Sequence, residues 1–168
     1  STINDLNLNG SSAVFYNDTS ALSGTNNHIG KFVMNADTCS IDGFLAGMTT
    51  LIDTLIVNTS CKNVILKNGY NTNITSELDI NTTPAFTTIK SDVAGIPAIL
   101  TKNNGTLCFD YLSIKDVTAT GGAQFFAGAN SVNSGGSAGW NFASCPPQPI
   151  AYYWVGGTGN WSDFANHW

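Results

Sequence analysis

A short alternating phrase recurs along the first two thirds of the chain: an apolar residue, a variable residue, another apolar residue and then usually asparagine. Its copies span residues 6–9, 32–35, 55–58 and 78–81, with a weaker copy at 112–115. These copies begin 26, 23, 23 and 34 residues apart. Periods of about 20–50 residues are typical of stacked repeats, because one repeat cannot bury its apolar side alone.

The alternation inside each copy predicts a β-strand, since its first and third residues share one face. Second short strands are predicted at residues 13–16, 62–66 and 85–89, between corners of Gly, Asn, Ser and Thr. No credible amphipathic helix separates them. The pattern therefore predicts an all-β fold, a right-handed parallel β-helix (solenoid) of about five coils over residues 1–145. The equivalent residues that we expect to stack in one sheet are Leu6, Phe32, Leu55 and Leu78.

Two later stretches depart from the period. Residues 96–100 form a strand-like insert, which is either an enlarged loop or a compressed extra coil. From residue 109 to 142 the composition shifts toward Gly, Ala and aromatic residues. The aromatic side chains Phe125, Phe126, Trp140 and Phe142 are expected to cover the open end of the stack, where backbone groups would otherwise lack partners. The alternative is an aromatic platform that binds sugar.

Asparagine ends each of the four clear copies, at Asn9, Asn35, Asn58 and Asn81. If these residues stack at one corner, each side-chain amide can bond to the amides above and below it, as in the Asn ladders of cross-β structures. Such a ladder would satisfy polar groups within the turn. The sequence thus predicts a four-residue amide ladder.

Composition narrows the classes of partner. Only 10% of residues are charged, against about 25% in an average domain. The net charge is −5, and all six basic residues are lysine. Nucleic acid and anionic membranes need clustered basic side chains, so neither is an expected partner. The absence of arginine also counts against polysaccharide lyases. No apolar run approaches the roughly 20 residues of a membrane-spanning helix, so membrane insertion is not expected.

Four cysteines predict two disulfides. Cys39 and Cys61 follow equivalent asparagines, which places them on adjacent coils about 4.8 Å apart, within reach of a disulfide. Cys108 and Cys145 would then form the second pair. Two bridges indicate an oxidising, extracellular location. The alternatives are four buried free thiols or a zinc site, although no two cysteines have the close spacing of a structural zinc site.

After Cys145, the stretch 146–151 contains three prolines and predicts a stiff linker. Residues 152–168 are rich in Trp and Gly, and the segments Trp154–Asp163 and Asn166–Trp168 resemble the opening signature of modules reiterated in very large surface proteins of Bacteroidota. The stretch 110–123, with 127–131 and 139–142, resembles the closing signature of the same modules. These proteins include the gliding-motility adhesins exported by the type IX secretion system.

The resemblance implies a filamentous cell-surface adhesin built from β-helical units, and it provides no catalytic residues to transfer. The order of closing signature, linker and opening signature implies a junction between modules. We therefore expect a piece of a longer chain, with residues 1–145 as one module and residues 152–168 as the start of the next. The triplet centred on Thr54 also resembles the O-glycosylation triplet used by Bacteroidota.

The search for a catalytic or metal site yields weak candidates only. His28 and His167 are the two histidines, and neither lies in a nucleophile motif. Parallel β-helices host glycoside hydrolases, which need two carboxyl groups about 5–10 Å apart. Asp37 with Asp53, and Glu77 with Asp79, are the pairs that stacking could bring together, although surface acids are the simpler interpretation. The segment Gly159–Asp163 could offer oxygens to calcium, but it contains one carboxylate. No cofactor and no metal are expected.

These observations favour a non-catalytic structural and adhesive repeat of a long extracellular surface fibre, with a role in adhesion and gliding. Its expected partners are adjacent modules of the same chain and external surfaces or glycans. The first alternative is a carbohydrate-binding or carbohydrate-active β-helix domain. The second is a passive spacer without a ligand.

Overall fold

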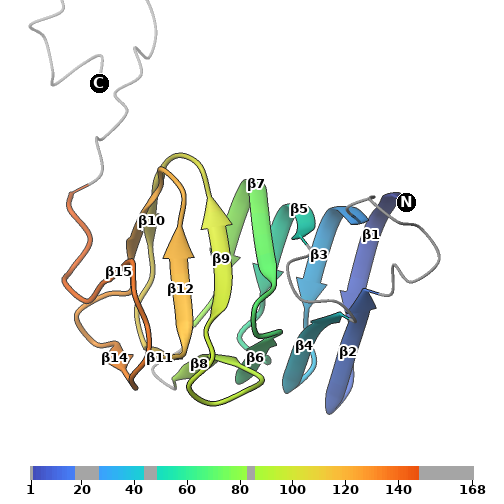
Figure 1. Cartoon of the computed structure of the whole chain (residues 1–168), viewed down its shortest axis with the longest axis horizontal. Helices are drawn as coiled ribbons and strands as arrows, with labels where there is room; N and C mark the ends of the chain where they lie inside the picture. The colour runs from blue at the N-terminus through green and yellow to red at the C-terminus, as the bar shows by residue number, and fades with distance from the viewer. Residues whose placement is uncertain (1, 18–26, 44–48, 83–85, 148–168) are drawn as a thin grey trace, which may run out of the picture.

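The computed structural model describes residues 2–17, 27–43, 49–82 and 86–147, and every regular element in these ranges is a β-strand. The strands wind around one axis and pair in parallel with the equivalent strand of the next coil (Figure 1). The fold is a parallel β-helix, as the sequence pattern predicted. No helix of membrane-spanning length occurs in the described ranges.

Each of the first four coils contributes two strands. The coils are formed by β1 (Thr2–Leu8) and β2 (Ser12–Asn17), β3 (Asn27–Met34) and β4 (Thr38–Gly43), β5 (Thr49–Val57) and β6 (Asn63–Leu66), and β7 (Asn71–Ile80) and β8 (Thr87–Ser91). The odd-numbered strands stack in one sheet in the order β1-β3-β5-β7, and the even-numbered strands stack in a second sheet in the order β8-β6-β4-β2. Both sheets turn one face toward a shared core.

The later coils have three sides, each formed by a strand of two to five residues. They contain β9 (Ala98–Lys102), β10 (Thr106–Cys108) and β11 (Leu112–Lys115), then β12 (Val117–Thr120), β13 (Gln124–Phe126) and β14 (Val132–Asn133), and finally β15 (Trp140–Asn141). β9 and β12 extend the first sheet, β11 and β14 extend the second, and β10, β13 and β15 form a third. Only residues 71–74 of β7 pair with β9. A turn then separates β9 from β10. The side of the coil that the single long strand β7 forms is therefore formed by two short strands in the next coil.

Residues of the repeated phrase stack as predicted in the first four coils. Leu6 pairs with Phe32, Phe32 with Leu55, and Leu55 with Leu78. Their side chains face the core, and Phe32 is completely buried. The fifth, weaker copy is not part of this column, because Leu112 pairs with Thr87 in the second sheet. An alternating phrase specifies which face is buried but not which sheet the strand joins.

The insert at residues 96–100 belongs to an additional coil. Its C-terminal part opens β9, where Ala98 and Leu100 are buried and Ile99 pairs with Asn71. The structure therefore decides between the two alternatives, an extra coil and an enlarged loop, in favour of the coil.

The asparagine corner forms a ladder of three amides. Asn58 Nδ2 donates to Asn35 Oδ1, and Asn35 Nδ2 donates to Asn9 Oδ1 over 3.0 Å. Asn81 occupies the equivalent backbone position, since its N–H donates to the Val57 carbonyl. Its side chain instead donates to Asp79 Oδ2 over 2.9 Å, so the prediction is wrong for the fourth amide. A carboxylate two residues away is a stronger acceptor than a neutral amide oxygen.

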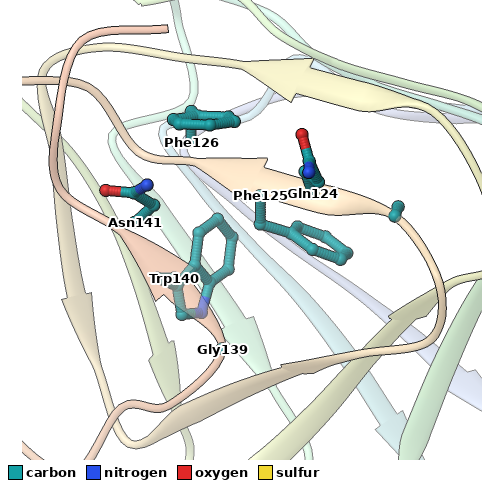
Figure 2. A pocket seen from close by; sticks show the side chains of 7 residues that line it. Gln124, Phe125, Phe126, Gly139, Trp140 and Asn141 are labelled. Atoms are coloured by element: carbon teal, nitrogen blue, oxygen red, sulfur yellow. The ribbon is translucent and has the colours of Figure 1, made fainter. Parts of the chain in front are cut away.

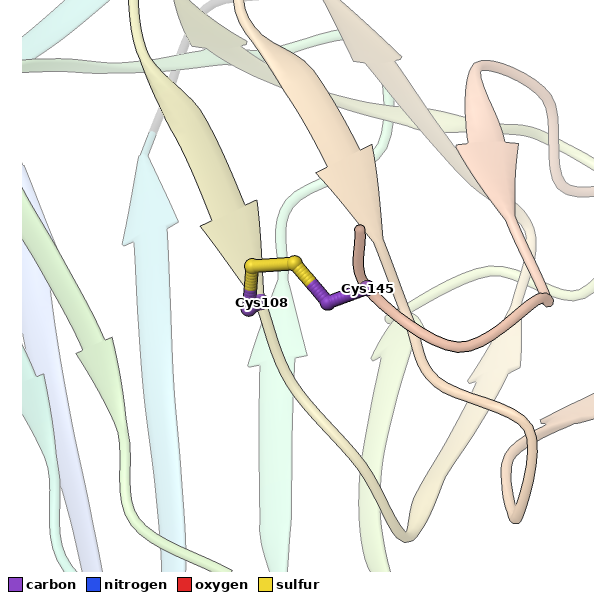
Figure 3. Close-up of a disulfide and its surroundings, with 2 residues drawn as sticks. All are labelled: Cys108 and Cys145. Carbon is purple, nitrogen blue, oxygen red and sulfur yellow. A yellow bond between two sulfur atoms is a disulfide. The ribbon is translucent and has the colours of Figure 1, made fainter. Parts of the chain in front are cut away.

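Cysteine pairing also differs in part from the prediction. Cys108 and Cys145 form a disulfide, with their Cα atoms 5.5 Å apart (Figure 3). The expected bridge between Cys39 and Cys61 is not formed, and both residues are buried free thiols. In the strand register Cys39 pairs with Val64, and Val64 lies three residues after Cys61 in the sequence.

Each free thiol is directed to a carbonyl of its own corner. Cys39 Sγ donates to the Ala36 oxygen over 3.3 Å, and Cys61 Sγ donates to the Asn63 oxygen over 3.4 Å. Burial raises the pKa of both thiols, that of Cys61 to about 12. Both side chains therefore contribute to the structure as small, mostly apolar groups in a buried corner.

A second column between coils is ionic. Lys67 Nζ lies 2.8 Å from Asp92 Oδ2 and 3.2 Å from Asp42 Oδ1, on the coils above and below it. Burial opposes ionisation of Asp92, but hydrogen bonds from Lys67 and from the Asn68 N–H lower its pKa. The same contacts raise the pKa of Lys67, first through Asp92 and then through Asp42. The outer face of the second sheet thus adds an acid–base–acid column to the backbone ladder.

The amide ladder leads to a stability prediction with an internal control. Asn35→Ala removes one hydrogen bond from each neighbour, and we expect it to lower the free energy of unfolding by about 1–3 kcal/mol. Asn81→Ala, at the same corner but outside the ladder, should cost less than about 1 kcal/mol. Urea denaturation monitored by circular dichroism measures both changes. Equal losses for the two variants would show that the ladder adds no stability.

Candidate functional site

A shallow hollow of about 270 Å³ lies over the third sheet, between β13 and β15 (Figure 2). Its walls combine aromatic rings with amide side chains: Phe125, Phe126 and Trp140 supply the rings, and Gln124 and Asn141 supply the amides. No residue in the lining carries a charge. The hollow is therefore a candidate binding site among the residues that the structure describes.

The rings of the hollow are held in fixed positions. Trp140 Nε1 donates to the Val117 carbonyl over 3.1 Å. Phe125 is 3% exposed and meets Trp140 edge to face, with ring centroids 5.3 Å apart and planes at 65°. Trp140 and Phe126 remain half-buried, while Gln124 and Asn141 are exposed. Phe125 and Trp140 face the core, whereas Gln124, Phe126 and Asn141 share the outer face. An aromatic ring beside amide donors and acceptors on that face suits a neutral polar ligand.

Glycines allow the last two coils to approach each other behind this hollow. Gly121 has a φ of +98°, and a Cβ there would lie 2.2 Å from the Lys102 carbonyl oxygen. Gly139 has a φ of +79°, and its Cβ would lie 2.0 Å from the Ala119 carbonyl oxygen. Only glycine combines a positive φ with such close backbone contact. These glycines therefore position β13 and β15 and the side chains on them.

The corner that precedes β11 is closed by a carboxylate. Asp110 Oδ1 accepts the N–H groups of Tyr111 (3.1 Å) and Asn130 (2.9 Å), and its Oδ2 accepts Asn130 Nδ2 (2.7 Å). The side-chain bond from Asn130, followed by the backbone bonds, lowers the pKa of Asp110. Tyr111 has a φ of 54°, so the carboxylate also stabilises a left-handed turn. Asp110 therefore links two coils through these hydrogen bonds.

Serine hydroxyls satisfy further backbone groups in the same region. Ser131 Oγ accepts the Leu112 N–H over 2.7 Å and donates to the Ala127 carbonyl over 2.6 Å. Ser137 Oγ accepts the Val117 N–H over 3.3 Å. The bond to Leu112 replaces a ladder bond that the two-residue strand β14 is too short to make. The bond to Val117 precedes the isolated bridge between Thr118 and Ala138. The residues behind the resemblance to adhesin modules thus have structural tasks here, as turns, close approaches and hydrogen bonds.

His28 and Asp53 come together on the outer face of the first sheet, a contact that the sequence did not predict. His28 Nε2 lies 2.8 Å from Asp53 Oδ1, and Thr75 Oγ1 donates to the same oxygen over 2.6 Å. These bonds, from Thr75 first and His28 second, lower the pKa of Asp53. The hydroxyl bonds to the carboxylate and not to the imidazole, so His28 does not activate Thr75 as a nucleophile.

The proposed acid pairs lie on different columns or face solvent. Asp37 lies at the corner before β4, where its carbonyl accepts the N–H groups of Lys62 and Asn63, whereas Asp53 lies within β5. Stacking therefore does not join Asp37 to Asp53. Glu77 and Asp79 flank buried Leu78 on the outer face of β7, as expected, and Asp79 is bonded to Asn81.

The remaining expectations fall in two groups. Thr54 lies half-buried on the outer face of β5, between Lys31 and Glu77 of the neighbouring strands, and its glycosylation stays a prediction. His167, the segment Gly159–Asp163, the motif at 152–168 and the linker beyond Pro147 lie outside the described residues. Within the described ranges, no group of three or more His, Cys, Asp or Glu residues is placed to hold a metal ion.

Comparison with protein families, with curated proteins and with solved structures found no match to this chain. The resemblance to adhesin modules therefore stays a prediction. The disulfide and the strand-only architecture are compatible with an extracellular protein.

Two glycine positions provide a test of how the last coils are held. Gly105 and Gly121 have φ values of +95° and +98°, but a Cβ on Gly105 would meet nothing within 4 Å. Gly105→Ala should cost about 1–2 kcal/mol for the backbone conformation alone. Gly121→Ala must also separate β12–β13 from Lys102, and we expect a loss of at least about 3 kcal/mol, measured by urea denaturation. Similar losses for both variants would refute the close approach as the reason for Gly121.

Proposed function

We propose that this chain is a non-catalytic structural and adhesive unit of a longer extracellular surface fibre. The observation that carries the proposal is the combination of a continuous parallel ladder with the Cys108–Cys145 disulfide. The ladder connects all described coils along one axis. The disulfide connects the C-terminal end of the solenoid to β10, the first strand of the third sheet.

The disulfide changes the path of a pulling force. The strands between its two cysteines, β11 to β15, are short, and β14 and β15 contain two residues each. A force applied beyond Cys145 would otherwise peel these strands away one at a time. The covalent link passes the force directly to Cys108, so the closing coils are shielded from extension. This property suits a fibre under tension.

The surface supports an extracellular, adhesive role. Only 10% of residues are charged, and the outer faces present Asn, Ser and Thr instead. Such a surface makes contacts through neutral hydrogen bonds, which salt screens little. Attachment of cells to external surfaces or glycans, including attachment during gliding, is the function that we infer from this surface and from the resemblance of residues 108–168.

Single-molecule pulling from tags at both ends tests the structural part. The two cysteines are 37 residues apart in the sequence, which corresponds to about 130 Å of extended chain. Compared with the native disulfide, the variant Cys108→Ser/Cys145→Ser should release about 130 Å more extension, and its first unfolding event should need less force. Cys39→Ser is the matched control and should leave the extension unchanged. An equal first unfolding force with and without the bridge would contradict the mechanical role.

A carbohydrate-binding function is the second candidate, because the hollow at β13 and β15 places exposed amides beside an aromatic ring on one face of the third sheet. A neutral sugar ring could pack on half-buried Phe126 while Gln124 and Asn141, on the same face, bond its hydroxyls. The adhesive contact would then be this hollow.

Binding to immobilised neutral oligosaccharides built from glucose, galactose or mannose tests that contact. The double variant Gln124→Ala/Asn141→Ala should weaken binding at least about tenfold, since two hydrogen bonds are lost. Asn104→Ala, an exposed amide in the turn before β10, is the control and should have no effect. Absence of binding to every neutral sugar would eliminate the carbohydrate candidate and leave the structural role untouched.

A further inference from the structure

Asparagine is followed by glycine at three places in the chain, at residues 9–10, 68–69 and 104–105. Asparagine is chemically labile in this context, because the main-chain nitrogen of the next residue can attack the side-chain carbon Cγ. Glycine hinders the attack least, since it has no Cβ beside that nitrogen. The reaction needs a glycine N–H without a hydrogen-bond partner and an asparagine side chain that can turn toward it. The structure separates the three pairs by these two requirements.

The pair Asn68–Gly69 is held through its main chain. The Gly69 N–H donates to the Pro97 carbonyl over 3.1 Å, and the Asn68 N–H donates to Asp92 Oδ1 over 2.7 Å. Both residues of the pair are half-buried. The nitrogen that would attack is therefore occupied, and the turn cannot change shape without losing bonds to the next coil.

The pair Asn9–Gly10 is held through its side chain. Asn9 Oδ1 accepts the bond from Asn35 Nδ2 over 3.0 Å, and the Gly10 carbonyl accepts the Asp37 N–H over 3.2 Å. Rotation of the Asn9 amide would break its bond in the amide ladder. This side chain is therefore restrained, although the pair itself is exposed.

The pair Asn104–Gly105 meets both requirements. It lies in the turn between β9 and β10, beyond the tip of the β9 arrow in Figure 1, and residues 103–106 are all exposed. Among the described residues, neither the Asn104 side chain nor the Gly105 N–H has a hydrogen-bond partner. A Cβ built on Gly105 would meet nothing within 4 Å, so the space around this glycine is open.

We propose that Asn104 is a site of spontaneous deamidation, with water as the second reactant. The Gly105 nitrogen forms a bond to Asn104 Cγ, the bond from Cγ to Nδ2 breaks, and the proton of the Gly105 N–H leaves with Nδ2 as ammonia. The product of this step is a five-membered succinimide ring. Water then opens the ring at either of its two carbonyl carbons, which gives aspartate in one case and isoaspartate in the other.

The modification changes the turn in charge and in length. Both products add a negative charge, and isoaspartate also adds a methylene group to the main chain before Gly105. The Gly105 carbonyl accepts the Gln124 N–H over 2.9 Å, where the pairing of β10 with β13 begins. The altered turn is therefore bonded directly to a residue that lines the hollow. The proposal does not depend on any ligand of that hollow.

Peptide mapping by mass spectrometry tests the proposal on the intact, folded chain. The protein is kept in mildly alkaline buffer, and the replacement of the side-chain amide by a carboxyl group is followed with time at the three pairs. We expect Asn104 to react at least about tenfold faster than Asn9 and Asn68, because reaction at those two residues requires local opening of bonded structure. The rate at Asn104 should rise with pH, since the Gly105 nitrogen must lose its proton to attack.

Two controls separate the effect of the fold from that of the sequence. In the chain unfolded by guanidinium chloride, the three pairs should react at similar rates, because the hydrogen bonds that distinguish them are lost. The variant Asn104→Gln should leave its peptide unchanged, because a glutamine amide can form only a less favourable six-membered ring.

Three results would overturn the proposal. The first is an equal rate at the three pairs in the folded chain. The second is no reaction at Asn104 in the folded chain under conditions in which the other pairs react. The third is the same preference for Asn104 in the unfolded chain, which would assign the preference to sequence neighbours and not to the turn.

Discussion

Parallel backbone hydrogen bonds between successive coils are the interaction on which the rest of this structure depends. A parallel strand has no stable edge of its own, so each coil needs a neighbour in the same register. The register then determines which side chains of successive coils lie above one another. It aligns Leu6, Phe32, Leu55 and Leu78 in the core, and it brings the amides of Asn9, Asn35 and Asn58 into one line. The side-chain columns reinforce a ladder that the backbone defines.

The same constraint explains why the two ends of the molecule differ. At the C-terminal end the strands shorten to two residues, and side chains take over the hydrogen bonds of the missing backbone. Asp110, Ser131 and Ser137 each bond to backbone N–H groups, and Trp140 covers the core. The disulfide then fixes this closing region to β10. At the N-terminal end no such replacement is present among the described residues, and apolar columns reach the end face.

The hollow at β13 and β15 follows from this closing region. Gly121 and Gly139 bring two turns of backbone close together. The strands that follow them, β13 and β15, direct Phe125 and Trp140 toward the core and place Gln124, Phe126 and Asn141 on the outer side of the third sheet. The proposed ligand contact would therefore use the same part of the molecule that closes the solenoid. Residues that close the solenoid also shape a surface on which an aromatic ring lies beside two exposed amide side chains.

The sequence by itself determined the strand class, the period and the buried face of the first four coils, because alternation and repetition are local patterns. It also identified the Asn corner and the Cys108–Cys145 pair. Contacts that are not repeated from coil to coil could not be predicted from the sequence: Asn81 turns to Asp79, His28 meets Asp53, and Cys39 and Cys61 remain free thiols. The tertiary structure also decided that Leu112 joins the second sheet. These outcomes depend on which of several neighbouring groups on adjacent coils makes the more favourable contact. The period of the sequence pattern does not show which groups become neighbours, so it could not predict them.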